Sequence, residues 1–76
     1  MTLWDLQANQ IAHVQNFHNA LSTTVANRLE EMGFCQGQPI VCLRRSPLKG
    51  PLVVQLGDCV YSLEQTIAEQ IHLTAA

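Results

Sequence analysis

The sequence predicts a small, mainly β domain: a strongly bent sheet or barrel of about five short strands, with one α-helix and a short helical turn. Apolar residues alternate over several short segments that are separated by glycine, proline or polar residues. The apolar period becomes helical over one long segment only, between residues 21 and 32. Because the chain has 76 residues and shows neither a repeat nor a linker, we expect a single domain over residues 1–76.

The N-terminal part of the chain is predicted to hold one strand. Leu3, Trp4 and Leu6 form a short apolar patch that we expect to dock on the core without forming an element of its own. Residues 10–17 are predicted to form the first strand, although their alternation is imperfect. A bulge near residues 15–16 would restore the alternation.

A helix is predicted over residues 21–32, and a glycine ends it. The residues that recur at helical spacing form one apolar stripe: Leu21, Val25, Leu29 and Met32. Asn19 or Ser22 could cap the start, while Gly33 stands where a helix commonly ends in a left-handed residue. Phe34 can then fold back on the last turn. We expect the stripe to pack on the core instead of serving as a docking surface, because a barrel this small needs a cover.

The next segment is predicted to be a strand followed by a loop. Gly37 suits a tight turn, and Pro39 suits a strand entrance, where its missing N–H does little harm. Residues 40–45 alternate, which places Arg44 on the same face as the other even-numbered residues. Residues 46–51 contain two prolines and a glycine and are predicted to be a loop.

The last third of the chain is predicted to complete the sheet. Residues 52–56 and 59–62 read as two strands joined by a two-residue turn at Gly57-Asp58. Residues 62–65 have the spacing of a capping box, so a single helical turn should follow. Residues 71–73 alternate and are predicted to form a closing strand.

Charge and cysteine usage narrow the classes of function. The net charge of −2, with only four basic residues, argues against a nucleic-acid-binding protein. Cys35, Cys42 and Cys59 match neither a zinc knuckle nor a disulfide framework. The sequence shows no signal peptide and no apolar run of about 20 residues, so the reducing cytoplasm is the expected location. No catalytic motif appears, and we expect no enzymatic activity.

In its order of motifs the chain resembles the ferrous iron transport protein A (FeoA) family. The similar segments are Leu3–Leu6, Arg28–Phe34 with Gly37, Ile40–Arg45, Ser46–Leu52, Tyr61–Leu63 and Ile71–Leu73. The most specific part is a helix ending in LEEMGFCQG, followed closely by RRSPLKGP. The resemblance implies a small SH3-like β-barrel. It also implies an accessory role beside FeoB, the ferrous iron permease with a cytosolic GTPase domain. The protein would then be peripheral to the membrane only through this partner.

The loop between the two central strands is the leading candidate for a partner-binding surface, weighed equally against a mere connection. Its prolines restrict the backbone, which lowers the entropy lost on docking. Arginine is favoured at interfaces for its planar donor fork. The residues predicted to bind the partner are Arg44, Arg45, Pro47, Leu48 and Lys49.

Other residues are predicted to serve the architecture, and a metal-responsive regulatory domain is the alternative function. Leu29, Met32, Gly33 and Gly37 are expected to fix the helix on the barrel. A transition-metal site would have to draw on His13, His18, His72, Cys35, Cys42, Cys59, Glu30 and Glu31. Because the cysteines show no paired spacing, single surface or strand histidines and small buried thiols are the favoured interpretation. Self-association through exposed strand edges is a further alternative.

Overall fold

The computed structural model describes residues 1–75. Its elements in chain order are the 3-10 helix η1 (Leu3–Asp5), β1 (Ile11–Phe17), α1 (Thr23–Met32), β2 (Pro39–Arg45), β3 (Leu52–Leu56), β4 (Cys59–Leu63), α2 (Gln65–Ala68) and β5 (Ile71–Ala75). The five strands, the one long helix and the short helical turn before the closing strand confirm the predicted architecture.

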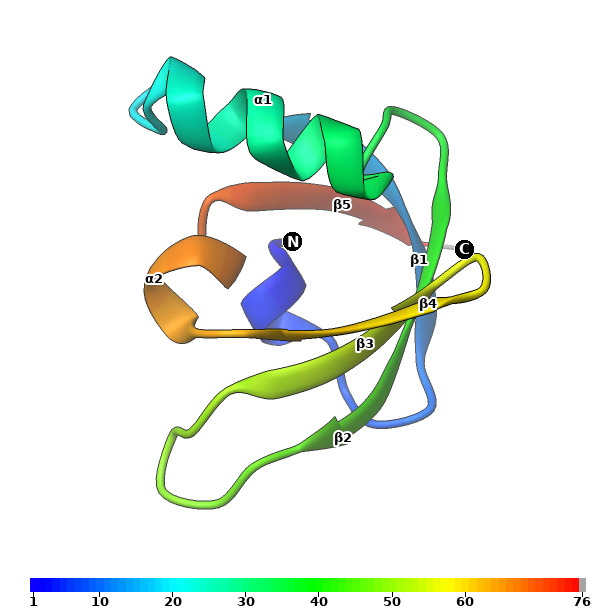
Figure 1. Ribbon diagram of the computed structural model, residues 1–76. Coiled ribbons are helices and arrows are strands. Elements are labelled where there is room, and N and C mark those ends of the chain that lie inside the picture. The colour runs from blue at the N-terminus through cyan, green and yellow to red at the C-terminus, as the bar shows by residue number, and fades with distance from the viewer. Residues whose placement is uncertain (76) are drawn as a thin grey trace.

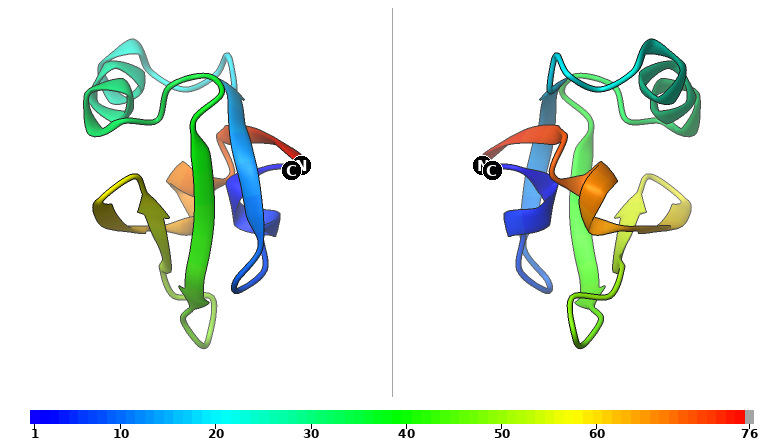
Figure 2. Two further views of the ribbon diagram at one scale, coloured as in Figure 1. Left: turned by 90° about the vertical axis from the view of Figure 1, so that its right-hand side faces the viewer. Right: turned by 90° about the vertical axis from the view of Figure 1, so that its left-hand side faces the viewer.

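All five strands belong to one antiparallel sheet with the order β4-β3-β2-β1-β5. The sheet curls around η1, while α2 lies at its side and α1 crosses above (Figure 1). Two further views show that the N-terminal segment with η1 lies close to β5 (Figure 2). Thr2 bridges to His72 and the Leu73 N–H donates to the Met1 carbonyl at 2.8 Å, so the N-terminal segment covers the outer edge of β5.

Two irregularities in the sheet decide which side chains face inward. The register of β1 against β5 shifts between Val14 and Asn16, which confirms the predicted bulge. A second shift, between Cys42 and Arg44 in β2, was not foreseen. It moves Arg44 off the inner face that Cys42 occupies and brings Arg45 inward in its place, so the predicted placement of Arg44 was wrong.

The core is built almost entirely from aliphatic side chains. Its buried members are Leu3, Leu6, Ala12, Val14, Leu29, Phe34, Ile40, Cys42, Leu52, Val54, Leu56, Leu63, Ala68, Ile71 and Leu73. No buried polar or charged residue occurs among residues 1–75. Of the predicted helix stripe only Leu29 is fully buried, while Val25 and Met32 pack against the core from its rim. Leu21 packs there too, but it precedes α1, which begins at Thr23 and not at the predicted residue 21. The helix is therefore a cover, as expected, but one held mainly by a single side chain.

The ends of α1 follow local rules. Ser22 is the N-cap, and its hydroxyl accepts a hydrogen bond from the Val25 N–H at 3.3 Å. At the other end Gly33 has a φ of 114°, and its N–H donates to the Glu30 carbonyl at 3.0 Å. The Phe34 N–H donates to the Leu29 carbonyl, also at 3.0 Å, and its ring is buried. These two bonds form the Schellman arrangement that the glycine predicts.

Two local predictions were wrong. The N-terminal patch does form an element, η1, because the Asp5 carboxylate accepts a hydrogen bond from the Thr2 N–H at 2.9 Å and fixes the turn. The capping box at residues 62–65 does not form. Ser62 stays in β4, and α2 begins after Glu64, whose side chain makes no capping bond. Pairing of Ser62 with Val53 in the hairpin outweighs the local capping preference.

Candidate functional site

The loop between β2 and β3 folds into a tight turn at its tip. The Gly50 N–H donates to the Pro47 carbonyl at 3.1 Å, and the Ser46 N–H donates to the Pro51 carbonyl at 3.3 Å. The two residues between Pro47 and Gly50 both have a φ of 58°. Positive φ at both central positions is the pattern of a type I′ turn, which normally selects asparagine or glycine there.

Here the two central residues are Leu48 and Lys49. A left-handed backbone costs an ordinary L-residue roughly 1–2 kcal/mol. Leu48 gains nothing from the core in return, since its side chain is 99% exposed. Lys49 is exposed as well. The fold thus holds an aliphatic and a cationic side chain outward on a rigid tip, at a conformational cost that the packing does not offset.

The two arginines before the loop have different surroundings. Arg44 is exposed and stands opposite Val53, on the outer side of the sheet. The Arg45 guanidinium is turned inward, where one nitrogen, Nη1, donates to the Trp4 and Leu6 carbonyls at 2.7 Å each. It also lies 4.8 Å from the centre of the Trp4 ring. Arg45 therefore differs from the expectation for a partner-binding residue, because its Nη1 donates within the chain and its guanidinium is turned toward the N-terminal segment.

Charge is distributed unevenly around this tip. Three of the four basic residues, Arg44, Arg45 and Lys49, lie in or beside it, whereas the six acidic residues all lie in other parts of the sequence. The exposed cations at this end are Arg44 and Lys49, since Arg45 is turned inward and lies near the Asp5 carboxylate. Such an end favours an acidic partner surface.

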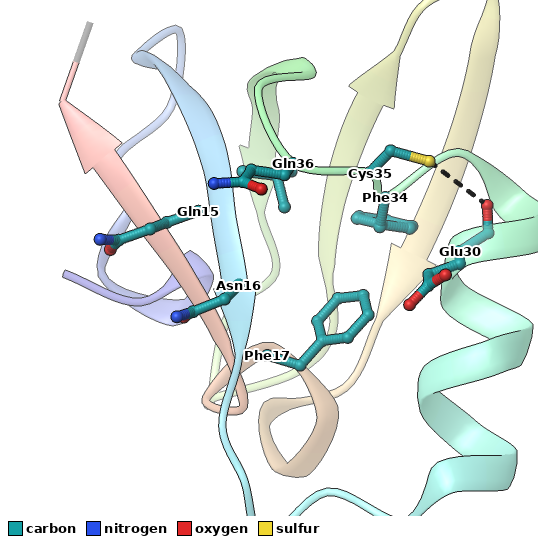
Figure 3. Close-up of a pocket in the computed structure, with 8 residues that line it drawn as sticks. Gln15, Asn16, Phe17, Glu30, Phe34, Cys35 and Gln36 are labelled. Carbon is teal, nitrogen blue, oxygen red and sulfur yellow. Dashed lines mark hydrogen bonds between the residues drawn. The ribbon is translucent and has the colours of Figure 1, made fainter.

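A hollow of about 330 Å³ lies between β1 and the C-terminal end of α1 (Figure 3). Phe17 and Glu30 point toward each other across it, and the Cys35 thiol donates to the Glu30 backbone carbonyl at 3.7 Å. The Cys35 partner is thus a carbonyl oxygen, which cannot take up the thiol proton as a general base would. The contacts of this thiol are not those of an activated nucleophile.

The metal-ligand candidates lie apart, with one exception. No group of three or more His, Cys, Asp or Glu side chains that could hold a metal ion occurs among residues 1–75. The rings of His18 and His72 are stacked, with 5.7 Å between their centres. His18 Nδ1 accepts a hydrogen bond from the Ala20 N–H at 3.0 Å, so the proton of the neutral ring resides on Nε2. Burial raises the pKa of the Cys42 thiol, which opposes formation of a metal-binding thiolate.

The residues predicted to be architectural hold the helix against the sheet. An added Cβ at Gly33 would lie 3.1 Å from Leu56 Cδ2, so the helix end and β3 meet closely there. Gly37 has a φ of 87° and its N–H donates to the Val14 carbonyl at 2.7 Å. Met32 contributes its backbone carbonyl, which accepts a hydrogen bond from the Tyr61 hydroxyl at 2.8 Å. No pattern in the sequence predicts this last contact, which spans 29 positions.

The described part of the chain contains no helix that is long and apolar enough to cross a membrane. The curled five-stranded sheet with its exposed loop defines a class of protein: a small SH3-like barrel.

Comparison with known proteins assigns the family. The model of the FeoA domain matches residues 1–75, and the chain belongs to the FeoA domain family. The structure is similar to Stenotrophomonas maltophilia FeoA, a prokaryotic SH3 domain protein solved with zinc, at 28% identity and a TM-score of 0.84, over 96% of this chain and 88% of that one. It is also similar to Chlorobium tepidum FeoA, at 28% identity and a TM-score of 0.88, over 99% of this chain and 70% of that one.

A manganese-dependent transcriptional repressor shares the fold, with a TM-score of 0.87 at 16% identity, over 100% of this chain and 41% of that one. A search of the curated proteins found no match.

Proposed function

We propose that this protein is a cytoplasmic accessory factor of bacterial ferrous iron uptake that binds the FeoB GTPase-permease and performs no chemistry of its own. Family membership supports the connection to iron uptake, since the Stenotrophomonas maltophilia relative has been put forward as a ferrous iron transport activating factor. The observation that carries the binding role is Leu48, which is fully exposed in a left-handed backbone on a rigid tip.

The proposed contact surface comprises Arg44, Pro47, Leu48 and Lys49. Leu48 would enter an apolar depression on the permease's cytosolic domain, while Arg44 and Lys49 would face carboxylates at its rim. The prolines and the turn hydrogen bonds keep the loop in one conformation, so that little entropy is lost on docking. Arg45 would contribute by fixing the base of the loop to the N-terminal segment.

Calorimetry with the purified cytosolic GTPase domain of the cognate permease tests the proposal, with and without a GTP analogue and in reducing buffer. We expect saturable binding by the unmodified chain and a loss of at least tenfold in affinity with Leu48→Asp. Thr24→Asp, which adds the same charge at an exposed position on α1, serves as the control and should bind normally. Equal binding by both variants would show that the loop is not part of the interface. Absence of binding by the unmodified chain would argue against this partner domain.

A further inference from the structure

Among residues 1–75 the sheet has one open edge, on β4. In the hairpin, Leu56 pairs with Cys59 across the two-residue turn. These two residues therefore close the ladder with mutual hydrogen bonds, and hydrogen-bonded pairs recur at every second position of β4. The intervening residues Val60 and Ser62 direct their N–H and C=O groups away from β3. Neither residue makes a backbone hydrogen bond outside the strand ladder in the described part of the chain, and β4 ends the strand order.

This edge lacks the features that normally keep strand edges apart. The sequence of β4, CVYSL, contains no charge and no proline, and its register against β3 runs without a bulge. Val60 is 56% exposed. The opposite edge of the sheet, on β5, is covered by Met1 and Thr2. Because the β5 edge is covered and the β4 edge is not, β4 is the strand to which a further strand could pair.

An apolar groove runs between α1 and the end of this same strand. Its volume is about 240 Å³, and it is lined by Val25, Arg28, Leu29, Met32, Leu63 and Ile67. Arg28 is the only charged residue in this lining. The hydrogen bond from the Tyr61 hydroxyl to the Met32 carbonyl bounds the space between helix and strand at the C-terminal end of α1.

We propose that the β4 edge and the α1 groove together form a second binding site, which accepts an extended segment of another protein as an added strand. The backbone of that segment would bond to Val60 and Ser62, and its inward-facing aliphatic side chains would enter the groove. A carboxylate on the same face of the segment would meet Arg28. The site is separate from the β2–β3 loop and does not depend on the identity of the partner proposed above.

Three features on the molecule specify this occupant. Unpaired N–H and C=O groups at alternate positions require an extended chain, because a helix leaves N–H groups free only in its first turn and C=O groups free only in its last turn. The aliphatic lining selects apolar side chains. The single cation at the groove selects an acidic residue over a basic one. A second copy of this chain meets the first two requirements through its own β4, but its nearest acidic residues, Asp58 and Glu64, lie just outside that strand.

A synthetic peptide provides a direct test. The blocked heptapeptide acetyl-TVTVTET-amide places its two valines and its glutamate on one face when extended. Titrated into the chain labelled with nitrogen-15 and carbon-13, it should bind with a Kd below about 1 mM. The amides of Val60 and Ser62 should shift and exchange more slowly, and the methyl groups of Val25, Leu29 and Ile67 should shift with them.

Controls separate the parts of the proposal. Replacing both valines of the peptide by threonine should abolish binding, and Arg28→Glu should weaken binding about fivefold or more. Arg44→Glu, the same charge change away from the groove, should have no effect. Shifts elsewhere on the chain, or none at all, would overturn the proposal. Concentration-dependent broadening of the β4 signals without peptide would also overturn it, by identifying a second copy of the chain as the occupant.

Discussion

The Arg45 guanidinium joins two segments that are 41 positions apart in the sequence. It lies 4.8 Å from the centre of the Trp4 ring and bonds the Trp4 carbonyl at 2.7 Å. Through the second bond, to the Leu6 carbonyl, it holds the end of η1 against the last residue of β2. The base of the proposed partner loop and the N-terminal segment are therefore one rigid unit.

Removal of the contacts between Arg45 and the N-terminal segment should destabilise the protein. Arg45→Ala loses two charge-assisted hydrogen bonds and a cation–π contact, so we expect the free energy of unfolding to fall by about 2–4 kcal/mol in urea titrations. Arg45→Lys should recover only part of this loss, because an ammonium is more strongly hydrated than a guanidinium and lacks the flat surface that stacks on the Trp4 ring. Arg44→Ala, at the exposed neighbouring position, should change stability by less than about 0.5 kcal/mol. Equal effects at the two positions would refute the assigned roles.

The two glycines after α1 should differ in their tolerance of alanine. Both have positive φ, so each substitution should cost about 1 kcal/mol from backbone strain. Gly33→Ala should cost more than Gly37→Ala. Its Cβ would approach Leu56 at 3.1 Å, whereas nothing lies within 4 Å of a Cβ at Gly37. Thermal melting of the two variants side by side measures the difference, and a larger loss at Gly37 would contradict the packing at the helix end.

The three thiols should fall into two kinetic classes. Cys35 and Cys59 are exposed, whereas Cys42 is fully buried and its burial raises the thiol pKa. Native protein treated with a thiol reagent at neutral pH should therefore modify two cysteines promptly and the third only on unfolding. Mass spectrometry of the labelled peptides identifies them. Rapid labelling of Cys42 in the native state would show that the sheet opens locally.

The Asp5 carboxylate should make the stability of the folded protein depend weakly on pH in the acid range. The hydrogen bond from the Thr2 N–H, foremost among several causes, lowers the pKa of Asp5 below its ordinary value of 3.8. A lowered pKa contributes stability above pH 3.8, and this contribution is lost as the pH falls through the folded-state value. Melting temperatures measured over a series of pH values test this. Asp5→Asn should lower the melting temperature slightly at pH 7 but not at the lowest pH, where Asp5 is protonated in both the folded and the unfolded state. Because the carboxylate is exposed, the effect should be small.

Substitution at the loop tip should separate binding from stability. Asparagine tolerates positive φ better than leucine, so Leu48→Asn should leave the free energy of unfolding unchanged or raise it by up to about 1 kcal/mol. The same change should weaken binding to the permease domain. A clear loss of stability would mean that Leu48 contributes to the fold, which its exposure argues against.

Much of the secondary structure could be predicted because its causes are local. The 3.6-residue period before Gly33, the hydroxyl of Ser22 and the turn at Gly57-Asp58 each specify a conformation through neighbours in the sequence. The broken alternation after Val14 predicted the bulge for the same reason. Wherever the causes lie within about four residues, the sequence by itself determined the result.

The tertiary structure decided what depends on distant contacts. A bulge in β2 exchanged the faces of Arg44 and Arg45, and the alternation of residues 40–45 did not reveal it, because that bulge is set by pairing with β3. Ser62 carries a capping signal, yet pairing with Val53 holds it in a strand. The open β4 edge likewise arises because the N-terminal segment covers β5 alone. Pairing residues that lie far apart in the chain costs loop entropy, and local sequence patterns do not show which of the alternative pairings repays that cost. The packing of the whole barrel selects the pairing that forms.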